Sequence, residues 1–188
     1  MRQDHRSQCS AAPYSATHAP ASADTVAKVQ SQLMNEQVEI LLSEVRFAER
    51  LCQRTARLYR RVQTIAIFLT VIGGSAVVAA AFNAAPGWAS VLGAACFGIF
   101  GAAMVAIRPA EKAVANEVDV KRYAQLRSAA ASMDEVALRT ALQKARESDA
   151  AEVEPLRDVA YNDVVIEIGR GEFAVPLSSQ QRFLAALA

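Results

Sequence analysis

The sequence predicts an all-α membrane protein, a two-helix transmembrane hairpin with cytosolic helices before and after it. Three observations lead to this prediction. Residues 62–107 form a run of 46 residues with no charged side chain, between Arg61 and Arg108. The run divides at residues 83–87 (NAAPG) into segments of 21 and 20 residues. Basic side chains gather on both flanks of the run, whereas the dividing turn has none.

Each apolar segment, 62–82 and 88–107, has about the length that crosses a hydrocarbon core of roughly 30 Å as a helix. Because lipid offers backbone groups no hydrogen-bond partner, both segments must be helical. Pro86-Gly87 favours a tight reversal, and the amphipathic ring of Trp88 suits the membrane boundary there. The alternative is a buried hairpin of a soluble protein. A soluble helix carries one apolar stripe, however, and these segments are apolar all round.

The composition gives little support for chemistry at an active site. The three cysteines, Cys9, Cys52 and Cys96, form no CxxC pair, so neither a zinc site nor a disulfide framework is predicted. Both histidines fall within the first 18 residues, and the chain has no phosphate-binding glycine loop and no GxSxG sequence. We therefore expect no enzyme and no cofactor.

Residues 1–33 are rich in Ala, Ser, Pro and Gln without an apolar period, which predicts a disordered tail. Ordered sequence is expected over 34–169, and Met34 is a plausible true start. The first cytosolic helix, 36–61, has no Gly or Pro and could continue unbroken into the first span.

This helix carries a heptad pattern of the kind found in coiled coils. Two sets of positions repeat every seven residues: Val38, Val45, Cys52 and Tyr59, and three residues after each of these Leu41, Ala48, Thr55 and Val62. The resulting seam should pack on another cytosolic helix or on a neighbouring subunit.

Arginines spaced three or four apart share one face of the same helix. They are Arg46, Arg50, Arg54, Arg57 and Arg61, joined by Arg60. Nucleic acid binding is one interpretation, but the stronger one is the positive-inside flank of a span, which also attracts anionic headgroups. The residues expected to flank the membrane are Arg54, Arg57, Arg60, Arg61, Arg108 and Lys112. This predicts a multi-pass membrane protein with both termini in the cytoplasm.

Small residues repeat every four positions along the second span, at Ser90, Ala94, Gly98, Ala102 and Ala106. Such a ridge lets helix backbones approach closely, either to the first span through Gly73, Gly74 and Ser75 or to a second subunit. On the first span Gln63, Thr70 and Gly74 share a face and could line a pore. The alternative, which we favour, is that Thr70 bonds its own backbone and Gln63 lies at headgroup level.

Three further cytosolic helices are expected after the spans, over about 110–131, 133–147 and 155–168. Pro109 suits the start of the first, Ser132 to Glu135 reads as a capping box for the second, and Gly169 suits the end of the third. Residues 170–188 form a tail with a short helix.

Three short motifs within residues 37–169 resemble the SLATT family, the SMODS- and SLOG-associating effector domains with two transmembrane helices. They are Arg46–Arg50 (RFAER), Arg108–Lys112 (RPAEK) and Glu154–Asn162 (EPLRDVAYN). The resemblance implies a membrane effector in a bacterial conflict or phage-defence system, triggered by a separate nucleotide-sensing or nucleotide-synthesising protein. It also implies that the membrane is the inner membrane of a bacterium.

Two functions are consistent with these features of the sequence. The first is a pore-forming or membrane-disrupting effector, which must be a homo-oligomer because two spans cannot enclose a channel alone. The second is a non-enzymatic membrane anchor or scaffold whose cytosolic helices dock a soluble partner. Growth arrest with dye entry would distinguish the effector, since an anchor leaves permeability unchanged.

Overall fold

The computed structural model describes residues 23–82, 86–150 and 152–188, and every regular element among them is a helix. The α-helices are α1 (Ala23–Ala81), α2 (Gly87–Ile107), α3 (Pro109–Ala129), α4 (Glu135–Arg146), α5 (Arg157–Glu167) and α6 (Ser179–Leu187). Single 3₁₀ turns are η1 (Ala130–Ser132), η2 (Glu154–Leu156) and η3 (Gly171–Phe173). The predicted all-α class is confirmed for this part of the chain.

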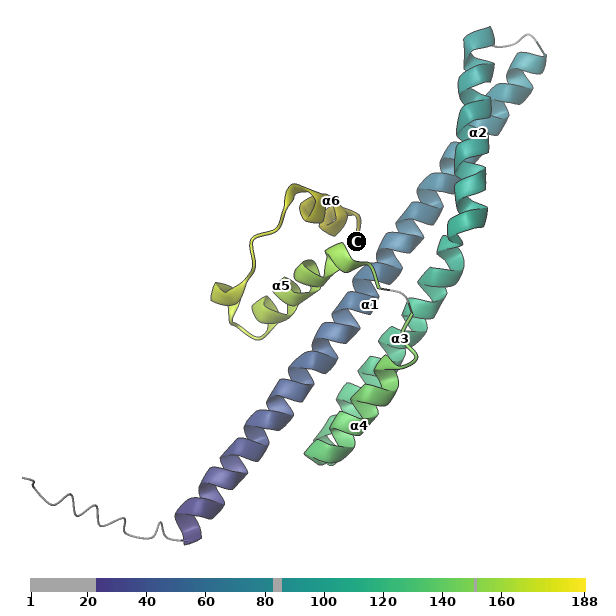
Figure 1. Ribbon diagram of the computed structural model, residues 1–188. Coiled ribbons are helices and arrows are strands. Elements are labelled where there is room, and N and C mark those ends of the chain that lie inside the picture. Colours follow the sequence, from purple (N-terminus) through teal and green to yellow (C-terminus); the bar gives the residue numbers. More distant parts are fainter. Residues whose placement is uncertain (1–22, 83–85, 151) are drawn as a thin grey trace, which may run out of the picture.

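The long helix α1 is the axis of the molecule (Figure 1). Its 59 residues extend about 88 Å at a rise of roughly 1.5 Å per residue. Helix α2 returns along the last third of α1, and α3 and α4 continue along its lower part. Helices α5 and α6 pack on the other side of α1, near its middle (Figure 1).

The heptad seam of α1 packs against helices of the same chain. Its buried members include Leu41, Val45, Ala48 and Cys52. They form one apolar core with side chains from α3, η1 and α4, namely Tyr123, Leu126, Ala130, Leu138, Leu142 and Ala145. Of the two expected partners, another cytosolic helix or a neighbouring subunit, the first fills the seam.

A second core joins α1 to the C-terminal helices. Leu51 and Leu58 lie on a different side of α1 from the seam and pack against Leu156, Val159 and Ala160. Leu184 and Leu187 of α6 cover this core. Burying a leucine or valine side chain contributes about 1.5–3 kcal/mol, so these contacts hold α5 and α6 on α1. We call residues 38–61 of α1, together with α3 to α6, the helical bundle.

The start of α1 corrects the expected extent of the tail. Residues 23–33 were assigned to a disordered tail, but α1 begins at Ala23. This stretch contains no Pro or Gly and consists largely of good helix formers, so propensity extends a helix that packing holds further along. Residues 1–22 lie outside the described part of the chain. As expected, α1 continues past Arg61 without a break.

The later boundaries differ by a few residues. Helix α3 ends at Ala129 and passes into η1, where 131 was expected. Helix α4 is capped by Asp134, whose Oδ1 accepts from the amide of Ala137 at 2.8 Å, whereas the expected cap, Ser132, donates its hydroxyl to Ala129. The C-terminal tail does contain a short helix, α6.

The end of α5 agrees more closely with the sequence. It lies at Glu167, one residue before the predicted end. Gly169 has a φ of 75°, the left-handed conformation that favours glycine after a helix. The amide of Arg170 then donates to Val165 and closes the terminus.

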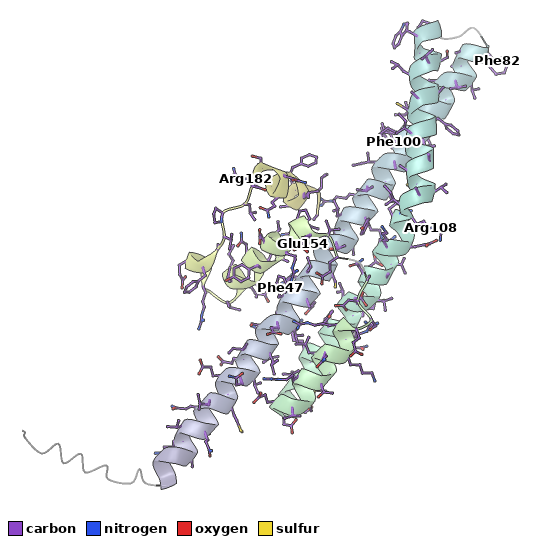
Figure 2. All side chains as sticks on the ribbon, viewed as in Figure 1. Phe47, Phe82, Phe100, Arg108, Glu154 and Arg182 are labelled. Carbon is purple, nitrogen blue, oxygen red and sulfur yellow. The ribbon has the colours of Figure 1, made fainter. Side chains whose placement is uncertain are left out.

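The apolar segments form an antiparallel pair that projects from the bundle (Figure 1). The two helices long and apolar enough to cross a membrane are Ala27–Ala81 and Gly87–Ser132, and only 11% and 6% of their most apolar stretches are buried. A core helix of a soluble domain would be mostly covered. We call residues 62–81 and α2 the apolar pair. Phe82 lies at its far end, and Arg108 lies at the α2–α3 junction (Figure 2).

Candidate functional site

The backbones of the apolar pair touch at two glycines. A Cβ atom added to Gly73 would lie 2.6 Å from the carbonyl oxygen of Gly93 and 2.9 Å from the amide nitrogen of Phe97. A Cβ added to Gly93 would lie 2.7 Å from the carbonyl oxygen of Gly73 and 2.9 Å from the Cβ of Ala76. No side chain fits at either position, so Gly73 and Gly93 set the separation of α1 and α2.

The predicted ridge lies on a different face of α2 from this contact. A Cβ on Gly98 would meet nothing within 4 Å. Ala94, Ala102 and Ala106 are exposed, and Ser90 is half-buried. At roughly 100° per residue, Gly98 is about 140° around α2 from Gly93. The ridge therefore does not pack on Gly73, Gly74 and Ser75, which corrects one of its two expected partners. Packing on a second subunit stays a prediction.

The three pore-lining candidates lie along the flank of the pair, and each is half-buried. The Thr70 hydroxyl donates to the carbonyl oxygen of Ala66 at 2.7 Å, the backbone bond of the favoured alternative. A Cβ on Gly74 would meet the ring of Phe97 at 3.4 Å. Within one chain Gly74 therefore borders a side chain of α2, and a pore lined by Gln63, Thr70 and Gly74 stays a prediction.

Several arginines of α1 form ion pairs with carboxylates far away in the sequence. Arg54 binds both carboxylate oxygens of Asp163 in α5, at 2.8 and 3.0 Å, and Arg50 binds Glu167 at 2.6 Å. The Glu167 contact raises the pKa of the Arg50 guanidinium. Since bidentate pairs fix geometry as well as charge, this face of α1 serves partly to hold α5 in place.

Of the remaining flanking cations, Arg60 and Lys112 make contacts between α1 and α3, whereas Arg57 and Arg61 have no carboxylate partner among the described residues. Arg60 pairs with Glu117 of α3 at 2.8 and 3.0 Å, which lowers the pKa of that carboxyl. Lys112 places its Nζ 5.5 Å from the centroid of the Tyr59 ring. Arg61 donates to the carbonyl oxygen of Ala186 at 2.7 Å, and Arg57 has no ion-pair partner among the described residues.

Arg108 forms the joint between α2 and α3. Its φ of 49° and ψ of 55° are left-handed, the only such values at a non-glycine residue in the described ranges. The joint lets α3 start at Pro109 along a new direction while Arg108 accepts from the amide of Lys112 at 3.2 Å. The Arg108 side chain points away from α1 (Figure 2).

The sequence reasoning missed a buried polar cluster between α3 and the loop after α4. The Tyr123 hydroxyl donates to Asp149 at 2.5 Å, and Asp119 accepts from the amide of Ala150 at 2.9 Å. Arg122 pairs with Asp119 at 3.0 Å. Burial raises the pKa values of Tyr123 and Asp149, and burial raises the pKa of the nearby Cys52 thiol to about 12. The cluster holds the loop against α3. Because burial keeps its thiol protonated, Cys52 is a poor nucleophile.

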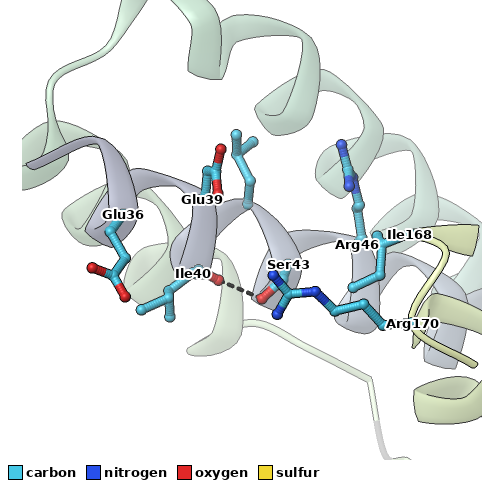
Figure 3. Close-up of a pocket in the computed structure, with 8 residues that line it drawn as sticks. Glu36, Glu39, Ile40, Ser43, Arg46, Ile168 and Arg170 are labelled. Atoms are coloured by element: carbon cyan, nitrogen blue, oxygen red, sulfur yellow. Dashed lines mark hydrogen bonds between the residues drawn. The ribbon is translucent and has the colours of Figure 1, made fainter. Parts of the chain in front are cut away.

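A groove runs between α1 and the end of α5. Two adjoining hollows of about 510 and 420 Å³ share Ser43, Ile168 and Arg170. The Arg170 side chain extends over Ser43, and Glu39 lies one turn earlier in α1 (Figure 3). We call it the α1–α5 groove. It mixes apolar and charged side chains, and no cluster of metal-ligating residues occurs in the ranges that the structure covers.

Comparisons with protein-family models, with curated proteins and with solved structures found no match. The arrangement of α1 to α6 is therefore interpreted from its own contacts. Its two unusual features are the glycine contact within the apolar pair and the exposed small-residue ridge on another face.

Proposed function

We propose that the chain is an integral membrane protein whose apolar pair crosses the bilayer, with both flanks in the bacterial cytoplasm. The large exposed side chains of the pair support this placement. Phe68 is 62% exposed, Val91 68% and Ile99 66%, an arrangement that is unfavourable in water and favourable in lipid. The basic flank at Arg57 and Arg61 supports the orientation.

Within the membrane, the chain acts as an oligomeric effector that forms a pore or disrupts the bilayer. The observation that supports this best is the exposed ridge at Gly98, because the hydrophobic effect does not hold helices together in lipid and small residues let backbones approach. The first span already occupies the Gly93 face, so the ridge remains available for another subunit.

The resemblance to SLATT proteins supplies the biological setting of this proposal. What the resemblance implies is a conflict or phage-defence system in which a separate protein makes or senses a nucleotide signal. The helical bundle is then the part that the trigger reaches, and the apolar pair is the part that acts on the membrane.

Induced expression with entry of a membrane-impermeant dye tests the proposal. The parent chain should resist carbonate extraction from membranes, admit dye and crosslink as an oligomer. Gly98→Leu should reach the membrane at the same level but lose the oligomer and the dye entry, because overpacking a close contact costs about 1–3 kcal/mol. Ile99→Leu, at a neighbouring position on a different face, is the control. An unchanged oligomer in Gly98→Leu would exclude the ridge as the interface.

The second candidate is a membrane anchor whose bundle docks a soluble partner. The α1–α5 groove favours it, since Ile168 and Phe173 expose apolar surface there beside Arg170. An anchor predicts that expression leaves permeability unchanged even when the oligomer forms.

A further inference from the structure

A basic groove lies between α1 and α3, directly before the point at which α1 loses its charges. Its volume is about 450 Å³. Four cationic side chains, Arg57, Arg60, Arg61 and Lys121, line it together with a single carboxylate, Glu117. Val120 contributes an apolar wall. A groove with this balance attracts anions and repels further cations.

The contacts within the groove leave part of its positive charge uncompensated. Glu117 is already bound to Arg60 through both oxygens, at 2.8 and 3.0 Å. Arg61 donates to a neutral carbonyl oxygen at 2.7 Å. Within the described ranges neither Arg57 nor Lys121 has an ion-pair partner. Three cations, Arg57, Arg61 and Lys121, therefore have no carboxylate partner in the described ranges and remain available for an external anion.

The position of the groove limits what that anion can be. Arg61 immediately precedes Val62, the first residue of the charge-free run. The Arg60–Glu117 pair and the Lys112–Tyr59 contact join α1 and α3 beyond the Arg108 joint, on the side away from the apolar pair. Arg57 lies about 6 Å from Arg61 along the helix. With the apolar pair across the bilayer, both arginines lie at the depth of the lipid headgroups.

We propose that this groove binds the phosphate group of an anionic phospholipid. The guanidinium groups of Arg57 and Arg61 and the ammonium group of Lys121 supply charge-assisted donors. The adjoining apolar surface accepts the carbon atoms next to the phosphate. The proposal rests on the membrane placement proposed above, but not on any effector activity.

Native mass spectrometry of the detergent-solubilised full chain tests this site by titration with phosphatidylglycerol. Phosphatidylcholine serves as the zwitterionic comparison and inorganic pyrophosphate as the free-phosphate comparison. We expect preferential binding of phosphatidylglycerol. Equal binding of the two lipids would overturn the requirement for net negative charge. Pyrophosphate that binds as tightly as the lipid would overturn the assignment to a phospholipid.

Charge variants then locate the site. Arg57→Gln and Lys121→Gln should each weaken phosphatidylglycerol binding about fivefold, whereas Glu117→Gln should strengthen it because Arg60 is released. Arg139→Gln removes the same charge on α4, outside the groove, and should leave binding unchanged. Equal losses in Arg57→Gln and Arg139→Gln would show that only overall charge matters and would overturn the site.

A charge-conserving variant and a measurement of helix content separate loss of binding from loss of folding. Arg57→Lys keeps the charge and should retain most of the binding, and circular dichroism should show the same helix content in every variant. A fivefold loss in Arg57→Lys would overturn the proposed role of this charge. Release of the chain from membranes by carbonate would contradict the membrane placement, whereas equal binding of the two lipids in detergent would contradict the groove, so the two outcomes are distinguishable.

Discussion

A leucine at Gly93 should force α1 and α2 apart, whereas a leucine at Gly98 should leave their contact unchanged. At Gly93 the first added carbon alone would lie 2.7 Å from a backbone oxygen and 2.9 Å from the Cβ of Ala76. Carbon atoms pack at about 3.5–4.0 Å, so the helices must separate by about 1 Å for Cβ and further for the rest of the side chain. A gap of that size forfeits roughly a quarter to a half of each contact energy, and overpacking costs about 1–3 kcal/mol.

The separation can be measured by electron paramagnetic resonance between spin labels in lipid nanodiscs. Labels at Val78 and Val91 lie on exposed positions of the two helices and can be introduced after the native cysteines are replaced by alanine. The distance distribution should broaden and lengthen in Gly93→Leu and match the parent in Gly98→Leu. An unchanged distribution in Gly93→Leu, or equal changes in both variants, would refute the glycine contact.

Four further predictions concern the bundle and the topology. Tyr123→Phe should lower the unfolding free energy by about 1.5–3 kcal/mol, measured by thermal denaturation in detergent, because Asp149 loses its hydroxyl donor. Burial raises the folded-state pKa of Asp149, so the stability from this group is present at low pH and lost as pH rises through that pKa. Asp149→Asn should therefore be more stable relative to the parent at pH 7 than at pH 4, and the opposite order in melting experiments would contradict this sign. Asp163→Asn should increase amide exchange in α5 by loosening its bidentate bond to Arg54, at a cost of about 1 kcal/mol given the partial exposure of the pair. A reporter fused after Ala188 should be cytoplasmic, and periplasmic activity of that fusion would contradict the topology.

The helical class and the apolar segments could be predicted because both follow from local properties of the sequence. A charge-free run of sufficient length and a seven-residue period are visible without knowledge of partners. The ion pairs of Arg50 and Arg54 could not be predicted, since their acids lie 117 and 109 residues away. A row of arginines before a span looks the same whether headgroups or a later helix neutralises it.

The sequence pattern also could not predict which face of α2 packs against α1. Small residues occur on several sides of this helix, at Gly93 and Gly101 as well as along the ridge. A four-residue period selects the ridge, but packing against α1 uses Gly93 because that residue lies opposite Gly73. The buried Tyr123–Asp149 bond was missed for a similar reason, since neither residue stands out before the loop after α4 folds back on α3.

One signal in the sequence does identify the face of α1 that packs on α2 in the apolar pair. The heptad positions Val38, Val45, Cys52 and Tyr59 continue at the same interval to Ala66 and Gly73, both of which are buried. One continuous seam therefore faces α3 and α4 in the bundle and α2 in the apolar pair. Beyond Tyr59 its side chains shrink to alanine and then to glycine, as the close backbone approach at Gly73 requires.

A seven-residue repeat sustained along one helix makes a left-handed supercoil, because it falls short of two full turns of a straight helix. The same interval therefore sets both the register of the bundle and the register of the apolar pair. No glycine or proline interrupts α1 between Ala23 and Ile72, so the helix has no sequence-encoded hinge between the bundle and the apolar pair. The return path has a joint at Arg108. Of the two connections between the bundle and the apolar pair, α1 is the stiff one, and the seam fixes how it packs against its neighbours at both ends.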